Sequence, residues 1–367
     1  MRRAFLLPVL TVLLLLPACT DLPQSTSPGV RLAVGGVKAA PPITVMSRNM
    51  YLGADIDALI APGADPRVVI PQALAQLQHN DYVARAQYIA MEIAARQPEA
   101  VGLQEVTHYI FDTVAGVQNL DYIDVLQLYL TAMGAHYDVA VRQNNVTLVI
   151  PVGAAGINSV TYTDGDAILV RHDIPWSNAA HGHYPTQAEL NVGGVTFDNL
   201  RGWNAVTLHV NGQDIRFVNT HMEIQAFRAV QEQQARELAA MLEDEPLPTV
   251  LVGDFNSAAN PSAPAEAKTE SYHTLRNAGF ADLELRDAHS NDIVTCCHLA
   301  DLSDVVPTFD QRLDLVLARW GKAGFGGQSD IEIVIGQRFP DHDYFLWPSD
   351  HAAVFGKIWP APGLANN

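Results

Sequence analysis

The chain has 367 residues, of which 48% are hydrophobic and 17% are charged, a composition typical of a soluble globular protein with a substantial core. Its length allows one large domain or two ordinary ones. The net charge of −18, from 22 basic and 40 acidic residues, argues against the positive surface of a general nucleic-acid binder, but it does not exclude a nuclease that holds its substrate locally.

The first residues are typical of a targeting segment rather than of a folded domain. A basic start, MRR, is followed by AFLLPVLTVLLLL, which is too short for a standard membrane span, and then by LPAC at residues 16–19. LPAC resembles the lipobox of bacterial lipoproteins. This resemblance implies a signal peptide over 1–18, a lipid on Cys19, and an exported protein anchored to a membrane outside the cytoplasm. A plain secretory signal is the alternative.

A tether and one domain are predicted to follow. Residues 20–42 are rich in Pro, Gly, Ser and Ala, so the segment from the anchor onward, 19–42, is predicted to be flexible. The pattern becomes ordered after it. Neither an internal repeat nor an internal linker interrupts the remainder, which predicts a single domain over 43–360.

The first ordered elements are two strands with a helix between them. ITVMSRN (43–49) and AVGLQEV (100–106) have the apolar pattern of strands. Asp81 is a candidate N-cap for the helix, and Pro98 follows its end. The apolar residues of this helix recur at helical spacing: Val83, Ala86, Ala90, Ile93 and Ala94.

The next part of the chain contains a predicted helix over 121–133 and predicted strands over 136–142 and 166–171. The region 107–165 around them, which includes the Gly-rich VGAAGINS, has no further assignment. It is a candidate wall of a substrate cleft.

A hairpin is the clearest local prediction. Asn211-Gly212 joins the extended runs AVTLHV and QDIRFVNTHM, and Asn-Gly is the strongest short-range hairpin signal. The remaining predicted elements are a helix over 226–242 and strands that include 250–252, 312–319 and 351–359. Helices and strands alternate irregularly, which predicts an α/β fold with helices on the outer faces of two mixed sheets.

The stretch VLVGDFNSAAN (250–260) ends a buried strand with two polar residues, Asp254 and Asn256. On an extended chain, positions i and i+2 point to the same side, so both side chains are predicted to share one face at the end of the strand. Sites of α/β proteins are commonly built at this edge. The structural alternative is that Asp and Asn form the turn that leaves the strand.

Several other predicted strands also end or begin at a residue capable of chemistry. These residues are Asn49, Glu105, His221, Asp314, Asp350 and His351. Each alone has an ordinary structural explanation, such as Asn49 as a turn former or His221 as a hydrogen-bonded core histidine. Their coincidence, in this order along the chain, favours a shared site.

The motifs QE, RGW, NTH, GDFNS, RLD and SDH resemble those of the endonuclease/exonuclease/phosphatase superfamily of metal-dependent phosphoesterases. Deoxyribonucleases, abasic-site endonucleases, bacterial sphingomyelinases and inositol-phosphate phosphatases belong to it. The resemblance extends over nearly the whole domain, and its motifs are short individually but specific together. It implies a four-layer α/β/β/α sandwich, with two packed mixed sheets and helices outside.

The resemblance also implies a divalent metal, Mg²⁺ or alternatively Mn²⁺. Glu105 would be its main ligand, and Asn49 and Asp350 would line the same site. A hard cation that keeps several waters is usually held by only one or two carboxylates. Asp254 would orient or deprotonate the attacking water, and Asn256 would hold this water or a phosphate oxygen.

Two further pairs of roles follow from the resemblance. His351 would pair with Asp314, whose carboxylate fixes the tautomer of the imidazole and raises its basicity. His221 and Arg201, the latter in LRGWNAV, would bind the non-bridging phosphate oxygens, where charge develops in the transition state. The implied reaction is in-line attack of water on a phosphate ester, without a serine or cysteine nucleophile.

The sequence leaves the substrate open between a nucleic acid and a phospholipid head group, and it implies no protein partner. A lipoprotein that kept the fold as a non-catalytic binding or adhesion module is the alternative function. Enzymatic hydrolysis is favoured because every candidate position carries a competent residue.

The chain has three cysteines. If Cys19 carries lipid, only the adjacent Cys296 and Cys297 remain. Neighbouring cysteines can close only a strained ring, which favours free thiols. The sequence Cys296-Cys297-His298 has no second cluster to complete a zinc site, so structural or incidental thiols are predicted rather than metal ligands.

Overall fold

The computed structural model describes residues 41–55, 64–192, 195–284, 293–321, 325–341 and 343–360. Cys19, the predicted signal peptide and nearly all of the predicted tether lie outside these residues. Within the described part of the chain, no helix is both long enough and apolar enough to cross a membrane.

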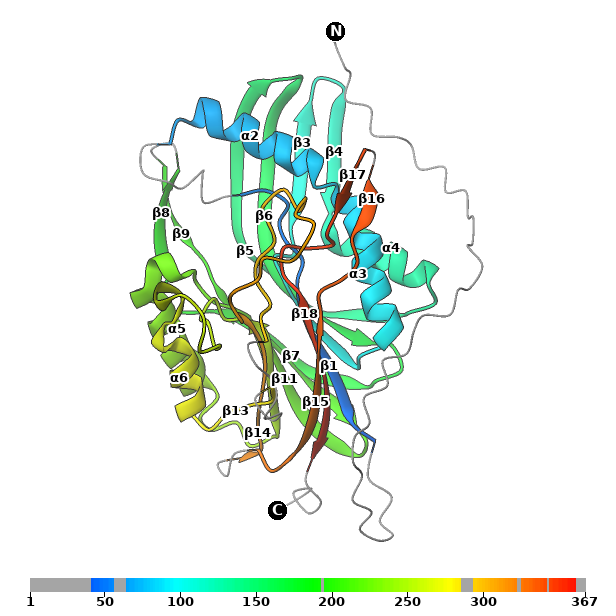
Figure 1. Ribbon diagram of the computed structural model, residues 1–367, viewed down its shortest axis with the longest axis vertical. Coiled ribbons are helices and arrows are strands. Elements are labelled where there is room, and N and C mark those ends of the chain that lie inside the picture. Colours follow the sequence, from blue (N-terminus) through cyan, green and yellow to red (C-terminus); the bar gives the residue numbers. More distant parts are fainter. Residues whose placement is uncertain are drawn as a thin grey trace. The chain divides into compact units, whose positions relative to one another are not determined.

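The first large sheet contains both the first and the last described strands of the chain (Figure 1). Its order is β15-β18-β1-β2-β6-β3-β4, and β5 pairs with β6. Its strands are β1 (Ile43–Asn49), β2 (Ala100–Gln104), β3 (His108–Thr113), β4 (Gly116–Asp121), β5 (Tyr137–Ala154), β6 (Ile157–Arg171), β15 (Gly327–Val334) and β18 (Ala353–Pro360). Parallel pairing of β1 with β2 and antiparallel pairing of β1 with β18 make the sheet mixed.

The second large sheet has the order β13-β14-β12-β11-β10-β7 and is also mixed, because β11 and β12 pair in parallel. Its strands are β7 (Trp176–His183), β10 (Gly202–Val210), β11 (Gln213–His221), β12 (Thr249–Asp254), β13 (Ala281–Asp282) and β14 (Asp314–Arg319). Two small hairpins complete the strands: β8 (Ala188–Val192) with β9 (Val195–Asn199), and β16 (Phe339–Asp341) with β17 (Tyr344–Leu346).

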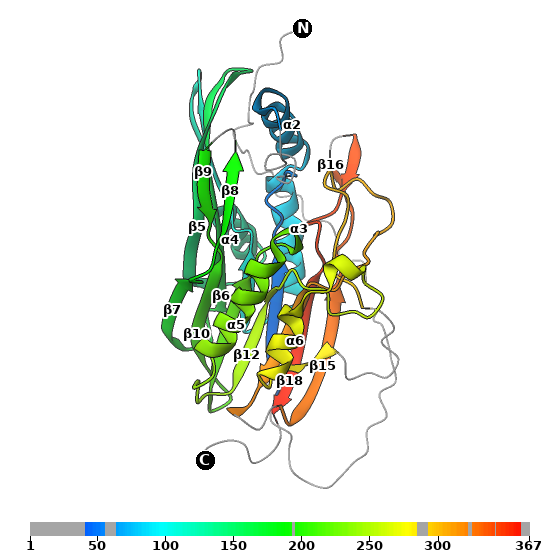
Figure 2. The same ribbon diagram turned by 90° about the vertical axis from the view of Figure 1, so that its left-hand side faces the viewer.

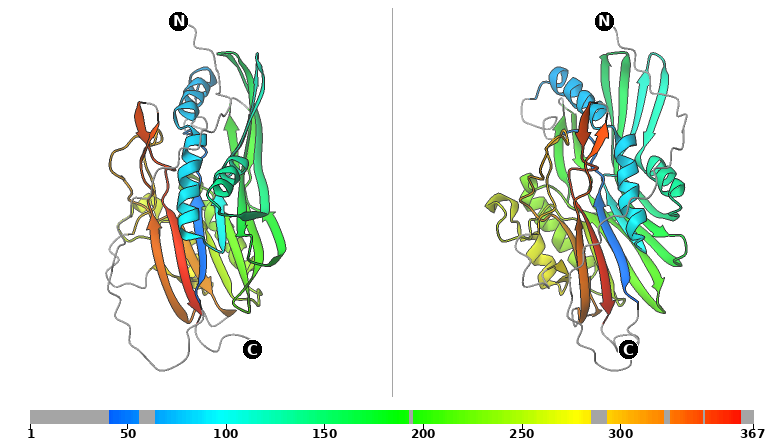
Figure 3. Two further views of the ribbon diagram at one scale, coloured as in Figure 1. Left: turned by 90° about the vertical axis from the view of Figure 1, so that its right-hand side faces the viewer. Right: turned by 45° about the vertical axis from the view of Figure 1, so that its right-hand side comes forward.

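The helices cover the outer faces of the two sheets (Figures 2 and 3). Helices α3 (Tyr82–Arg96) and α4 (Tyr122–Ala132) share a core with the first sheet, and α5 (Arg228–Met241) and α6 (Glu270–Asn277) share one with the second. The other helical segments are α2 (Pro66–His79), η1 (Gln225–Phe227) and η2 (Ala265–Ala267). The result is the four-layer α/β/β/α sandwich that the sequence predicted.

The alternation of side chains along β12 shows how the sequence builds these layers. Val250 and Val252 point into the core between the two sheets, whereas Leu251 points into the core beneath α5 and α6. Both faces of this strand are therefore covered, and a continuous apolar run is what such a strand requires. All six residues of β12 are buried.

A polar contact fixes the two sheets together beneath the site. Asn219 of β11 donates a hydrogen bond from Nδ2 to the carbonyl of Leu103 at 3.0 Å, and its Oδ1 accepts one from Gln104 Nε2 at 2.6 Å. The sheets approach closely here because Gly102 carries no side chain. A Cβ at this position would lie 2.5 Å from Asn219 Oδ1 and 2.6 Å from a methyl carbon of Val252.

Most of the predicted elements are confirmed. Asp81 caps α3 by accepting hydrogen bonds from the backbone N–H groups of Val83 and Ala84, and the predicted Asn-Gly turn joins β10 and β11. Apart from the helix predicted at 121–133 and the strand predicted at 136–142, the region 107–165 had no assignment, and it supplies β3, β4, the rest of β5 and most of β6. The strand predicted at 100–106 ends earlier, at Gln104, because Glu105 leaves the extended conformation with φ 55°.

Candidate active site

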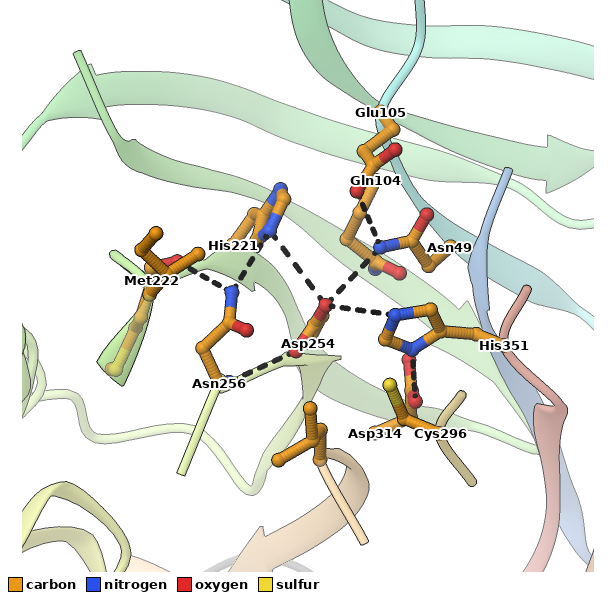
Figure 4. Close-up of polar contacts among 12 residues, drawn as sticks. Asn49, Gln104, Glu105, His221, Met222, Asp254, Asn256, Cys296, Asp314 and His351 are labelled. Carbon is orange, nitrogen blue, oxygen red and sulfur yellow. Dashed lines mark hydrogen bonds and ion pairs between the residues drawn. The ribbon is translucent and has the colours of Figure 1, made fainter. Parts of the chain in front are cut away.

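The nine predicted site residues within the described part of the chain lie together. They come from both sheets and from the loops that follow the strands. Six of them line one cavity: Glu105, Arg201, His221, Asp254, Asn256 and Asp350. Asn49, Asp314 and His351 are joined to this group by the hydrogen bonds and ion pairs described below (Figure 4).

Asn49 connects the two sheets at the centre of the site. Its Nδ2 donates to Glu105 Oε1 at 3.0 Å and to Asp254 Oδ2 at 3.1 Å. The second oxygen of Glu105 accepts from the backbone N–H of Leu52 at 2.7 Å. Both carboxylate oxygens of Glu105 are thus held in place, and its left-handed backbone conformation is a cost that the surrounding contacts must offset.

Asp254 and Asn256 lie in the same site, but not through the extended geometry that the sequence predicted. The strand ends at Asp254, and Asn256 has φ 49°, a left-handed conformation that Asn tolerates. The backbone N–H of Asn256 donates to Asp254 Oδ1 at 2.9 Å, so the two residues form a turn. The predicted i, i+2 geometry is therefore wrong, because the chain bends back as soon as the strand ends. This turn places both residues in the lining of the cavity.

His351 forms the predicted pair with Asp314. Its Nδ1 lies 2.8 Å from Asp314 Oδ2, and its Nε2 lies 3.8 Å from Asp254 Oδ2. Burial lowers the pKa of His351, but the carboxylates of Asp314, Asp350 and Asp254 outweigh this effect and hold the pKa well above its usual range. These neighbouring carboxylates favour the protonated form of the imidazole.

His221 has the opposite electrostatic environment. Its ring nitrogens lie 2.9 and 3.2 Å from Arg201 Nη1, and its Nε2 lies 3.7 Å from Asp254 Oδ2. Burial and the charge of Arg201 lower the pKa of His221 well below its usual range. Because a guanidinium can only donate, the ring accepts from Arg201 and is neutral. Arg201 Nη2 also lies 3.9 Å from Glu223 Oε1, and this ion pair helps to hold the guanidinium in place.

The carboxyl groups of the site resist ionisation in the absence of a cation. Burial, and then the neighbouring charge of Asp350, raise the pKa of Glu105. Burial also raises the pKa of Asp350, and it raises that of Asp254 to about 6 against the charge of His351. Several buried acids with mutually raised pKa values form a site that a divalent cation would stabilise, because the cation favours their charged forms.

The donor atoms fit a hard metal ion. Glu105 and Asp350 offer carboxylate oxygen, the ligand that Mg²⁺ prefers, and both line the cavity. Asn49 faces Glu105 with its Nδ2, and its Oδ1 accepts from the backbone N–H of Tyr51 at 2.9 Å. Asp254, Asp314 and His351 form a second group that could hold a metal, with ligand atoms within 4.8 Å of one another.

Two buried arginines, which the sequence analysis did not identify, support this arrangement. Arg85 of α3 donates to the carbonyls of Met50 and Tyr51, in the segment between Asn49 and Leu52. Arg48 donates to the carbonyl of His351 and pairs with Glu92. Neither arginine has a local sequence signal. Both side chains are fully buried, and burial disfavours a charge without such partners.

Two buried acids of β6 also belong to the site and were missed. Asp164 lines the cavity, and burial raises its pKa to about 7 against the charge of Arg201. Burial together with the charge of Asp164 raises the pKa of Asp166 to about 8. The sequence signal was present, since the strand predicted at 166–171 begins at the last residue of the acid-Gly-acid stretch DGD at 164–166.

Cys296 and Cys297, which were expected to be free thiols, have their sulfur atoms within bonding distance of each other. Cys297 Sγ lies 4.0 Å from His351 Nε2, and Cys297 forms part of the wall of the site.

Comparison with known proteins agrees with this architecture. Three solved structures share the fold at low sequence identity. An endonuclease/exonuclease/phosphatase family protein from Leptotrichia buccalis has a TM-score of 0.53 at 16% identity, covering 86% of this chain and 99% of its own. A humanized D. rerio TDP2 has 0.52 at 15%, covering 86% and 98%. The mannosyl-6-phosphatase of Bacteroides thetaiotaomicron has 0.50 at 15%, covering 86% and 99%. No match to this chain is found among curated proteins.

A four-layer sandwich with carboxylates, histidines and an arginine gathered where the two sheets meet defines the class of protein. The profile of the endonuclease/exonuclease/phosphatase family matches residues 73–351, which is most of the chain. The chain belongs to this family, and membership supports a phosphoesterase.

Proposed function

We propose that this protein is a Mg²⁺-dependent hydrolase of phosphate esters, with Mn²⁺ as an alternative ion. One observation carries the proposal. A single buried network beside one cavity joins the carboxylate of Glu105, the His351–Asp314 pair and the Arg201–His221 pair. These are the parts that in-line attack of water on a phosphate ester requires.

Glu105, Asn49 and Asp350 would hold the metal. When bound, the metal supplies charge that stabilises the phosphoryl oxygens and the leaving oxygen. Asn49 also keeps the carboxylates of Glu105 and Asp254 apart, because its Nδ2 donates to both of them.

Asp254 is suited to orient and deprotonate the attacking water. Its Oδ1 is occupied by the backbone N–H of Asn256, so Oδ2 is the atom directed toward the other groups. A pKa of about 6 brings this carboxylate near the range in which a general base works at neutral pH. His351 is held by Asp314, and in its protonated form it would supply a positive charge and a proton next to Asp254.

Arg201, His221 and Asn256 would bind the non-bridging oxygens. Arg201 is buried, and its guanidinium is directed at the ring of His221. Asn256 Nδ2 lies 3.2 Å from the same ring and 3.0 Å from the carbonyl of Met222. These donors are held by other protein groups before a substrate arrives, so little reorganisation is needed when charge develops on the phosphate.

The proposal is tested with a panel of DNA, RNA, sphingomyelin, phosphatidylinositol and inositol phosphates, each assayed with Mg²⁺ and with excess chelator. We expect hydrolysis of at least one phosphate ester, with loss of activity in chelator and recovery when Mg²⁺ is restored. Activity that persists in chelator would contradict metal dependence. Binding without hydrolysis across the panel would favour the non-catalytic binding module.

We also propose that a lipid on Cys19 anchors the protein to a membrane outside the cytoplasm and that the protein acts there. No protein partner is required. The support is the sequence of the first nineteen residues alone. Cys19→Ala is expected to leave an unprocessed or mislocalised precursor, measured by fractionation and by the mass of the mature N-terminus, whereas Thr20→Ala serves as the matched control. Normal processing of Cys19→Ala would show that the signal is an ordinary secretory one.

A further inference from the structure

The cavity that holds the catalytic groups continues into an apolar chamber. Its volume is about 330 Å³, at the lower end of the range of roughly 300–1,000 Å³ for ligand pockets. At one end are the polar groups of the site. The rest of the lining is largely apolar and comes from α2, β5, β6 and the β8–β9 hairpin. Figure 1 shows α2 crossing the far halves of β5 and β6.

Helix α2 contributes an apolar face that folding leaves partly open. Ile70, Leu74 and Leu77 recur at helical spacing and line the chamber. None of the residues of α2 is fully buried. Leu74 and Leu77 pack partly against the first core, and the part of this face that remains uncovered is available to a ligand.

Strand β5 contributes a second apolar face with the period of a strand. Leu148, Ile150 and Val152 line the chamber and are partly buried, whereas the alternate residues Val149 and Pro151 are exposed on the other side. An apolar group that enters the chamber would cover both faces, and burial of apolar surface is favourable in proportion to its area.

The charges around the chamber do not suit a polyanion. Among the described residues that line the cavity, Arg201 is the only Lys or Arg, and it is already close to Glu223. Asp164 and Glu223 add negative charge beside it. A nucleic acid needs several cations along its backbone. This cavity offers positive charge for one phosphate.

We propose that the substrate is an amphiphilic phosphate ester: its phosphate lies among the catalytic groups, and its alkyl or acyl chain occupies the chamber formed by α2, β5 and β6. This inference rests on the proposed phosphoesterase function and names its substrate class. The chemistry is shared by membrane phospholipids and by soluble esters with a long apolar chain, so the test must separate these sources.

The test uses p-nitrophenyl phosphodiesters whose second ester group is methyl, butyl or octyl, kept below their micelle concentrations and assayed with Mg²⁺. We expect kcat/KM to rise by roughly two orders of magnitude from methyl to octyl, because each buried methylene contributes up to about fourfold. Ile150→Asn should lower kcat/KM for the octyl ester about tenfold and leave the methyl ester within about twofold. Val149→Asn, which alters the neighbouring side chain on the 66% exposed outer face, should change neither.

A second variant tests the chamber independently, in case Ile150→Asn does not fold. Ala73→Phe, on a half-buried position of α2 that lines the chamber, should fill the space and reduce the rate for the octyl ester only. Dihexanoylphosphatidylcholine as monomers and phosphatidylcholine vesicles then distinguish a soluble from a membrane source, and cleavage of either supports the proposal. Rates independent of chain length, with Ile150→Asn equal to Val149→Asn, would overturn the chamber but leave the hydrolase intact.

Binding is measured alongside turnover, so that the two proposals can fail separately. Octylphosphonate is expected to bind the Mg²⁺-loaded protein at least tenfold more tightly than methylphosphonate by calorimetry. The same preference without hydrolysis of any ester would uphold the chamber and overturn the proposed activity. Equal affinity for the two phosphonates, or an oligonucleotide cleaved faster than the octyl ester, would overturn the chamber.

Discussion

His351→Ala is expected to lower the rate of hydrolysis by about 10²–10⁴-fold, the usual contribution of a positioned acid–base group. The imidazole lies between Asp314 at 2.8 Å and Asp254, the proposed general base, at 3.8 Å, and the carboxylates around it favour its protonated form. Steady-state kinetics on a phosphate ester cleaved by the parent protein provide the measurement.

Asp314 acts through the histidine that it holds. Asp314→Ala should therefore cost less than His351→Ala, and the double variant should be little worse than His351→Ala alone. Rates that fell independently and multiplied in the double variant would show that the two residues do not act as a unit. His172→Ala is the matched control. This histidine also pairs with an aspartate, Asp138 at 3.0 Å, but on an exposed surface, so its loss should leave the rate unchanged.

Glu105→Gln is expected to abolish activity at low Mg²⁺ by weakening the metal site. The change keeps the size of the side chain and removes the charge that a divalent cation needs. We expect the Mg²⁺ affinity to fall by at least 10–100-fold, the range found even for groups that only support metal ligands. Titration of the rate with Mg²⁺ or Mn²⁺ should show partial recovery at high metal concentration.

Folding of Glu105→Gln should survive, because one of the two hydrogen bonds from Asn49 and Leu52 can be kept. The free energy of unfolding should fall by no more than about 1–3 kcal/mol, as measured by denaturant titration. Glu99→Gln is the control, since Glu99 is also a buried carboxylate near β2 but accepts its hydrogen bonds from Thr44. If the two variants had the same metal dependence, Glu105 would not be a metal ligand.

Elements with a complete local signal were predicted well. The Asn211-Gly212 turn requires positive φ at both residues, and the structure gives 54° and 76°. Asp81 has both the residue type and the position of an N-cap. In each case the residues that determine the structure lie within a few positions of one another, so the local sequence is sufficient to predict the element.

Elements stabilised by distant contacts were missed. Helix α2 was not predicted; it contains Pro71, and none of its residues is completely buried. The far half of β5 is interrupted by Pro151 and Gly153, but fourteen residue pairs along the hairpin with β6 hold it as a strand. Here pairing with another segment decides the structure, and the local pattern does not.

The candidate site shows the same division. Asn49 and Asp254 are 205 positions apart and meet by a hydrogen bond that no periodicity could reveal. The motifs placed these residues in one site only through resemblance to a family. Local reasoning placed Asp254 and Asn256 side by side through the wrong geometry, since an extended strand was assumed where the chain turns.

The pairing of β18 with β1 has a consequence for the order in which the protein matures. Asp350 and His351 directly precede β18, which must insert between β15 and β1, the first strand of the sheet. During synthesis, a chain that has been produced only up to Asp314 therefore still lacks His351, the proposed proton donor. The complete candidate site can form only in a late step, after nearly all of the domain has been made.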